Sequence, residues 1–133
     1  ISDIGWPACG EIDIMELVGH EQSTIHGTAH YGAQGQGYSI FKGNHSTLDG
    51  GQHYDDEFHV FSIVWESNSI KWYRDDILFH SLIPSDIGNE VWRFNQEFFF
   101  IFNVAVGGQW PGYPDATTVF PAKMEIDYIR VFQ

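Results

Sequence analysis

The chain has 133 residues, a length that suits one domain of ordinary size. Hydrophobic residues make up 43% and charged residues 18%, which excludes a disordered tail, and no apolar run is long enough to span a bilayer. Six Lys and Arg stand against 18 Asp and Glu, and the net charge of −12 argues against binding to nucleic acid or to an anionic membrane.

Short runs of β-branched and aromatic residues, separated by Gly, Asn, Asp and Pro, predict an all-β chain. In chain order we expect strands at about 11–18, 23–31, 38–42, 57–65, 69–74, 77–82, 96–106 and 123–132. Residues 43–56 and 107–118 are expected to be loops, and 84–95 a loop with one helical turn. The spacing of the strands is typical of an antiparallel β-sandwich.

The strands at 57–65 and 96–106 are apolar on both faces, so we expect other elements to cover both of their sides. Asp75-Asp76 is expected to form a two-residue hairpin turn, although Asp-Gly would suit the left-handed backbone better. The one cysteine, Cys9, excludes an intrachain disulfide and is interpreted as a small packed residue.

The segment 10–16 carries three carboxylates close together. Alternate side chains of a strand share a face, so Glu11 and Asp13 point the same way, but strict alternation would bury Glu16 among apolar residues. We therefore predict a β-bulge around Ile14-Met15 that returns Glu16 to the carboxylate face. The Cα atoms of Glu11 and Glu16 would then lie roughly 13 Å apart, and their carboxyl groups could approach to about 5–6 Å.

The spacing leaves three interpretations of these carboxylates open. Two Glu at that separation suit a retaining glycosidase, in which one attacks carbon and the other donates a proton. The charge of Asp13 between them would raise the proton affinity of both neighbours. Alternatively the face is merely solvated, or it binds calcium, although calcium prefers oxygen ligands that converge from a loop.

Residues 6–16, WPACGEIDIME, resemble the active-site strand of glycoside hydrolase family 16, in the bulged form of laminarinase-type endo-β-1,3-glucanases. The resemblance continues at 26–31 (HGTAHY), 102–112 (FNVAVGGQWPG) and 126–132 (IDYIRVF), so it spans nearly the whole chain. It implies an antiparallel, concanavalin-like jelly-roll β-sandwich. Domains of this family are about twice as long. We therefore expect 1–133 to be a single partial domain, the C-terminal half with the active site, without the family's N-terminal strands.

The resemblance also implies roles for individual residues. Glu11 matches the nucleophile of a retaining mechanism, Asp13 the assisting carboxylate and Glu16 the acid/base. Four residues match substrate contacts in the cleft: Trp6, His30, Asn103 and Trp110. For His30 a structural role is the alternative, and a structural role is what we expect for His26. Asp127 matches a residue that helps to hold a structural calcium, while catalysis itself requires no cofactor.

From the resemblance we expect an endo-acting hydrolase of β-1,3 or mixed β-1,3/1,4 glucans such as laminarin, in a secreted, extracellular or periplasmic location. The alternatives are a non-catalytic, lectin-like β-sandwich and an inactive half-domain. Related agarases and carrageenases share the bulged pattern, so a galactan is a second substrate class. Without the N-terminal strands the apolar faces of 57–65 and 96–106 would be exposed, and we expect self-association or a complementary N-terminal half to cover them.

Overall fold

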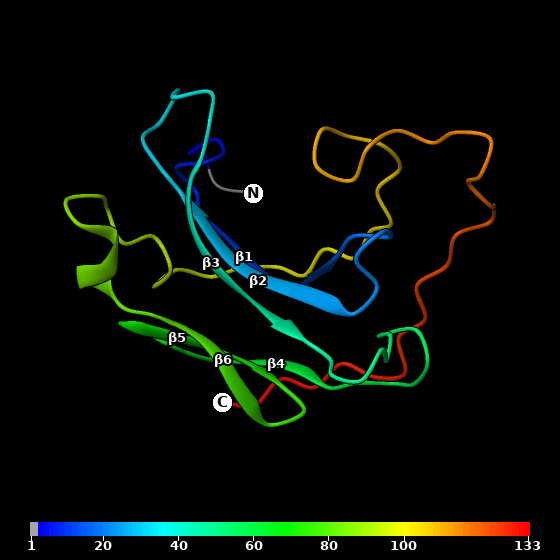
Figure 1. Cartoon of the computed structure of the whole chain (residues 1–133). Coiled ribbons are helices and arrows are strands. Elements are labelled where there is room, and N and C mark those ends of the chain that lie inside the picture. The colour runs from blue at the N-terminus through cyan, green and yellow to red at the C-terminus, as the bar shows by residue number, and fades with distance from the viewer. Residues whose placement is uncertain (1–2) are drawn as a thin grey trace. The chain divides into compact units, whose positions relative to one another are not determined.

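The computed structural model describes residues 3–133 and divides the chain into two units, a first that ends at Glu97 and a second, Phe98–Gln133. The first unit contains every strand that the structure describes (Figure 1). These are β1 (Glu11–Leu17), β2 (Thr24–Tyr31), β3 (Ile40–Thr47), β4 (Phe61–Glu66), β5 (Ser69–Arg74) and β6 (Ile77–Leu82). A single 3-10 turn at Pro84–Ile87 follows them, which confirms the helical turn expected in 84–95.

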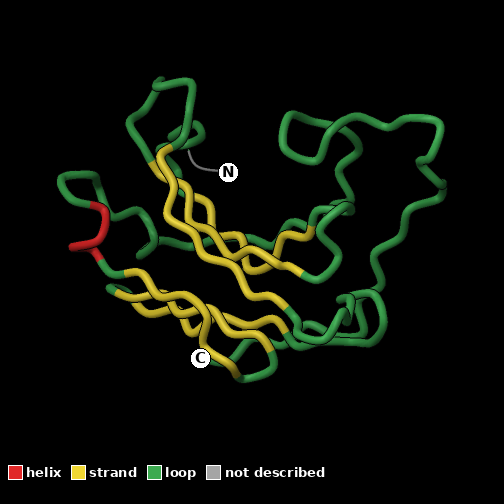
Figure 2. The backbone as a smooth tube through the Cα atoms, viewed as in Figure 1, coloured by secondary structure: helices red, strands yellow, loops and turns green. Residues whose placement is uncertain are grey.

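The strands form two antiparallel sheets of three, in the orders β1-β2-β3 and β4-β5-β6 (Figure 2). The two sheets form separate layers of the first unit, and β3 contacts β6 while β1 contacts β4. The predicted all-β, antiparallel sandwich is therefore confirmed. Within residues 3–133, no helix has the length and apolar character needed to cross a membrane.

The core of the first unit draws on both sheets. Its largest fully buried side chains are Trp72, Tyr31, Phe94, Ile25, Ile70, Leu82 and Pro7. Burial of a side chain of this size stabilises the fold by about 1.5–3 kcal/mol. On β2 the buried residues Ile25, Ala29 and Tyr31 alternate with His26 and His30, so the two histidines face away from the core.

β3 is longer than the sequence predicted. Residues 43–47 look like a turn-rich loop because they include Gly, Asn and Ser, but they belong to β3. They pair in unbroken register with β2, from Gly43 opposite Thr28 to Thr47 opposite Thr24. Cross-strand pairing with a neighbour has outweighed the local preference for a turn.

The strands predicted at 96–106 and 123–132 are wrong for this structure, since Phe98–Gln133 contains no strand. A strand persists through hydrogen bonds to a neighbour, and the apolar pattern of one segment does not supply that neighbour. Apolar side chains are consequently exposed there, as at Ile101 (71%). Double-sided cover is also wrong for β4, an edge strand in which Val64 is exposed.

The β5–β6 hairpin turns at Asp75 and Asp76, with φ of 46° and 65°, as predicted. The Asp75 side chain also holds the segment before β4, since its carboxylate accepts the Val60 N–H at 2.9 Å and contacts His59 Nδ1 at 2.8 Å.

The two turn residues should therefore respond differently to replacement by glycine. Asp76→Gly relieves a left-handed conformation that costs a residue with a Cβ up to about 1 kcal/mol. We expect Asp76→Gly to raise the urea midpoint and Asp75→Gly to lower it. Equal midpoints for the two variants would contradict this account.

Candidate active site

β1 contains the predicted bulge. The strand pairs with β2 in normal register up to Asp13 opposite Thr28, and pairing resumes with Glu16 opposite His26. Two residues of β1, Ile14 and Met15, therefore stand opposite one residue of β2. Directly paired residues share a face, so the bulge puts Glu16 on the same side as the two earlier carboxylates. The prediction of a bulge that turns Glu16 outward is confirmed.

His30 of β2 contacts both β1 and the loop before β3. His30 lies opposite Glu11, and its Nε2 is 3.2 Å from Oδ2 of Asp13. Its other ring nitrogen, Nδ1, is 2.9 Å from the hydroxyl oxygen of Ser39 in the loop before β3. Polar atoms of Asp13, Glu16 and His30 all lie within 4.8 Å of one another. The three side chains thus converge on one point of the sheet.

Trp6 adds a donor to the same face. Its indole N–H donates to Oε2 of Glu11 at 2.6 Å, and its ring centroid lies 6.5 Å from that of His30. The side chain is still half exposed, at 51%. The resemblance suggested Trp6 as a substrate contact, and the structure adds a hydrogen bond from its indole to the Glu11 carboxylate.

The pKa values of both glutamates are raised above 4.5. For Glu11 the causes are burial and then the charge of Asp13, while the Trp6 hydrogen bond and His30 oppose the change. For Glu16 they are burial and then the charges of Asp13 and Glu11, with His30 and the Thr28 hydroxyl opposing. A carboxyl group that holds its proton nearer to neutral pH can serve as a general acid.

The pKa of His30 is raised above 6.5, first by its close contact with Asp13; burial opposes the rise, and the charges of Asp13, Glu11 and Glu16 add to it. The histidine binds its proton more tightly in the folded protein than in the unfolded chain. Its stabilising contribution is therefore complete below pH 6.5 and is lost as the pH rises through the folded-state pKa. Protonated His30 places a positive charge beside Asp13.

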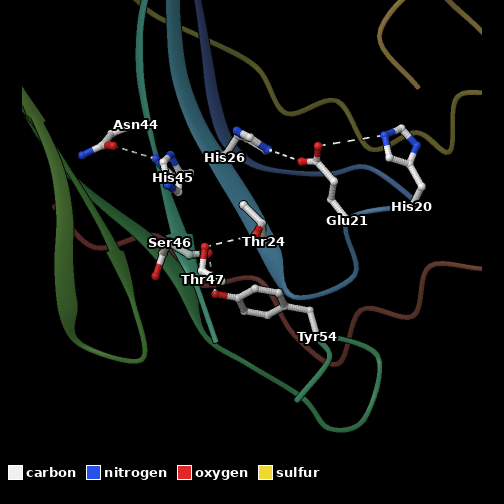
Figure 3. Close-up of polar contacts among 9 residues, drawn as sticks. All are labelled: His20, Glu21, Thr24, His26, Asn44, His45, Ser46, Thr47 and Tyr54. Atoms are coloured by element: carbon white, nitrogen blue, oxygen red, sulfur yellow. Dashed lines mark hydrogen bonds and ion pairs between the residues drawn. The ribbon is translucent and has the colours of Figure 1, made fainter. Parts of the chain in front are cut away.

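His26 lies opposite Glu16 on the same face of the sheet, and its side chain contacts the loop before β2. Its Nε2 lies 3.4 Å from Oε2 of Glu21, a contact drawn in Figure 3, and the structural role expected for His26 stays a prediction. Nearby, the hydroxyls of Thr24 and Thr47 are 3.0 Å apart and join β2 to β3 at this end of the sheet (Figure 3).

Three residues suggested by the sequence lie in the second unit, which is described by itself. Asn103, Trp110 and Asp127 are all exposed there, and their assigned roles stay predictions. Conversely, sequence reasoning missed Thr28 and Ser39. Alternation along β2 was enough to place Thr28 beside Asp13, but no local signal links Ser39, nine residues away, to His30.

Two groups of side chains within residues 3–133 could offer ligands to a metal ion, namely Asp13 with Glu16 and His30, and His53 with Asp55 and Asp56. In the first group the raised pKa of His30 favours a proton over a metal, because a ligating histidine must be neutral. Asp127 belongs to neither group, and its role in holding a structural calcium stays a prediction.

The raised pKa values of Glu11 and Glu16 predict how the stability of the protein depends on pH. Above pH 4.5 the unfolded chain releases these protons before the folded protein does, so stability falls as the pH rises through the folded-state pKa values. Glu11→Gln and Glu16→Gln remove that cost. We expect each variant to melt a few degrees higher than the wild type at pH 7, with the gain shrinking at pH 4. The exposed Glu57→Gln serves as the control, and unchanged or lower melting temperatures of both site variants at pH 7 would refute the burial argument.

The chain is similar in sequence, and in fold, to known glucanases. The chain is 35% identical to glucan endo-1,3-beta-glucosidase A1 of Niallia circulans, over 96% of this chain and 20% of that protein. It is 36% identical to a beta-glucanase of Rhodothermus marinus, over 96% and 46% respectively. The X-ray structure of an endo-beta-1,3-glucanase from Pyrococcus furiosus matches 90% of this chain and 46% of that chain, with 46% identity and a TM-score of 0.78.

The chain thus spans less than half the length of these relatives. The sequence profile of glycosyl hydrolases family 16 matches residues 2–130. The match includes the bulged strand with its three carboxylates and both histidines of β2. The chain belongs to glycosyl hydrolases family 16.

Proposed function

We propose that the protein is a retaining endo-β-glucanase that hydrolyses β-1,3 or mixed β-1,3/1,4 glucosidic bonds, such as those of laminarin. The observation that carries this proposal is the bulge of β1, which sets Glu11, Asp13 and Glu16 on one face of the sheet. Relatives named as glucan endo-1,3-beta-glucosidase and beta-glucanase support the choice of substrate. A neutral glucan is also compatible with a chain of net charge −12.

In the proposed double displacement, Glu16 gives its proton to the glycosidic oxygen while the Glu11 carboxylate attacks the anomeric carbon. The bond to the leaving sugar breaks and a covalent glycosyl ester of Glu11 forms. Water then attacks the same carbon, Glu16 takes back a proton from it, and the ester bond breaks. Glu11 and Glu16 return to their starting states, and no cofactor takes part.

The surroundings of the two glutamates suit these different roles. The Trp6 indole N–H points at Glu11 and favours its ionised form, which a nucleophile requires. Burial and the charge of Asp13 raise the pKa of both glutamates, and the charge of Glu11 adds to that effect at Glu16, which suits a residue that must carry a proton as an acid. We propose that Asp13 stays paired with His30 and maintains this difference through the reaction.

We further propose that Trp6, His30, Asn103 and Trp110 bind the glucan, with the two indoles stacking on sugar rings, whose C–H faces are apolar. A secreted, extracellular or periplasmic location would bring the enzyme to such a polymer. These assignments rest on the motifs that contain the residues and on the exposure of both indoles, 51% for Trp6 and 50% for Trp110.

The roles of the two glutamates can be separated by substitution. On laminarin, Glu16→Gln should lower kcat by about 10²- to 10⁴-fold, the usual contribution of a general acid, and Glu11→Ser should abolish hydrolysis. With an aryl β-laminaribioside as substrate, azide should restore turnover by Glu11→Gly and give an α-glycosyl azide. With the same substrate, azide should restore turnover by Glu16→Gly and give a β-glycosyl azide. A reducing-sugar assay and NMR of the product anomers read out both steps.

Glu57→Gln, a change at an exposed carboxylate, should keep wild-type activity and serves as the control. Wild-type protein that binds laminarin without releasing reducing ends would instead support the lectin-like alternative. Wild-type protein that does neither would support an inactive half-domain. Release of reducing ends from agarose or carrageenan but not from laminarin would move the substrate to a galactan.

We also propose that the exposed apolar residues of the second unit are covered in solution, by a second copy of the chain or by a complementary N-terminal half. Val119, Ile101 and Phe99 are 84%, 71% and 66% exposed. Exposed apolar surface of this kind marks an interaction site or an aggregation liability. Size-exclusion chromatography with light scattering should show species above the monomer mass of 15.2 kDa. A clean monomer that unfolds cooperatively would refute the proposal.

A further inference from the structure

Trp72 connects the second sheet to the bulge of β1. It lies in β5, is 0% exposed, and is the largest fully buried side chain of the described core. Its indole N–H donates to the backbone carbonyl of Asp13 at 2.9 Å, across 59 residues of sequence. Asp13 is the last paired residue before the bulge. The Asp13 carbonyl is part-buried at an interrupted ladder, where a hydrogen-bond donor is needed, and Trp72 supplies one.

The residue opposite the bulge leaves room for this indole. A Cβ at Gly27 would lie 2.6 Å from Cδ1 of Trp72 and 2.9 Å from Cζ of Phe79. Real Cβ atoms do not approach so closely, and Gly27 is not among the glycines of left-handed conformation. Space, not backbone freedom, therefore requires glycine here. The bulge, Gly27 and Trp72 fit together as one unit.

The indole itself is held in place by its own sheet. His80 of β6 pairs directly with Trp72, and the two rings lie 4.6 Å apart at an angle of 30°. Burial lowers the pKa of His80, which favours a neutral ring beside the indole, and the two rings are tilted against each other. With one face against His80 and its N–H on Asp13, Trp72 has little freedom to move.

We infer that Trp72 is a positioning residue: by holding the Asp13 carbonyl, with Gly27 giving it access, it fixes the bulge and so keeps Asp13 and Glu16 together with His30. This inference rests on the proposed function for its kinetic consequences. Trp72 touches no substrate and lies beneath the carboxylate face, and it acts through the backbone of β1. The bulge alone does not fix the carboxylates, because its extra residue is left unpaired and the hydrogen-bond ladder is locally disrupted there.

The primary test replaces Trp72 with Phe, which keeps an aromatic ring but removes the donor. Trp92→Phe is the matched control, because the Trp92 indole also donates to a backbone carbonyl, that of Ser67 at 2.8 Å, away from β1. The readouts are the NMR titration of the His30 imidazole, the steady-state constants on laminarin and the urea midpoint. Both variants should lose stability, so stability alone does not decide the question.

We expect the His30 titration midpoint to fall toward 6.5 in Trp72→Phe and to stay at the wild-type value in Trp92→Phe. On laminarin, Trp72→Phe should lower kcat by about 10- to 100-fold, the effect of a small misplacement of catalytic groups, while KM stays within about twofold. A wild-type His30 titration in Trp72→Phe would overturn the inference, as would an equal change in Trp92→Phe.

A second pair of variants keeps the Trp72 indole and tests the space that Gly27 leaves for it. Gly27→Ala should reproduce the His30 shift, whereas Gly19→Ala, where a Cβ meets no atom within 4 Å, should not. In the wild type, the Trp72 indole N–H should exchange with solvent far more slowly than free indole, and exchange as fast as free indole would overturn the inference even if no variant folds. If the wild type hydrolyses no glucan, the proposed function fails, but the titration and exchange measurements still decide the role of Trp72.

Discussion

A regular strand shows every second residue to one side, and three carboxylates at positions 11, 13 and 16 cannot satisfy that rule. One extra residue in β1 resolves the conflict, and the rest of the site follows from it. The core side of the strand is preserved, with Ile12 paired to the buried Ala29, while Glu16 joins Glu11 on the outer side. The irregularity would weaken an isolated sheet, but here the second layer supplies a donor at that point.

Three carboxylates close together repel one another, and the first unit offsets this repulsion with a small number of contacts. His30 lies against Asp13, and the Trp6 N–H lies against Glu11. Neither contact cancels the effect of burial, so both glutamates hold their protons more firmly than in a peptide. Under the proposed function, the site lowers the stability of the fold in exchange for acid–base chemistry, a common arrangement in enzymes.

Local pattern was sufficient for the bulge, the hairpin turn and six of the strands, because each depends on alternation or turn chemistry within a few residues. Local pattern failed where pairing with a neighbouring strand decides whether a segment becomes a strand. Residues 43–47 became strand through their register with β2, and 96–106 did not become strand although the segment is strongly apolar. The contact of Trp72 with Asp13 left no trace in the sequence, since strand propensity and burial already account for a tryptophan at that position.

Glu11 and Glu16 stand on one short strand, five residues apart, and not on two elements that must meet. Motion of β1 therefore carries both acids along as a pair, as long as the Trp72 contact keeps the bulge in place. In the proposed enzyme, the distance between the attacking and protonating groups depends on the backbone of β1 and on that contact, whereas the alignment of the polymer depends on the surrounding loops. Under the same proposal, loops around such a strand can diverge to accept differently linked sugars without disturbing the chemistry.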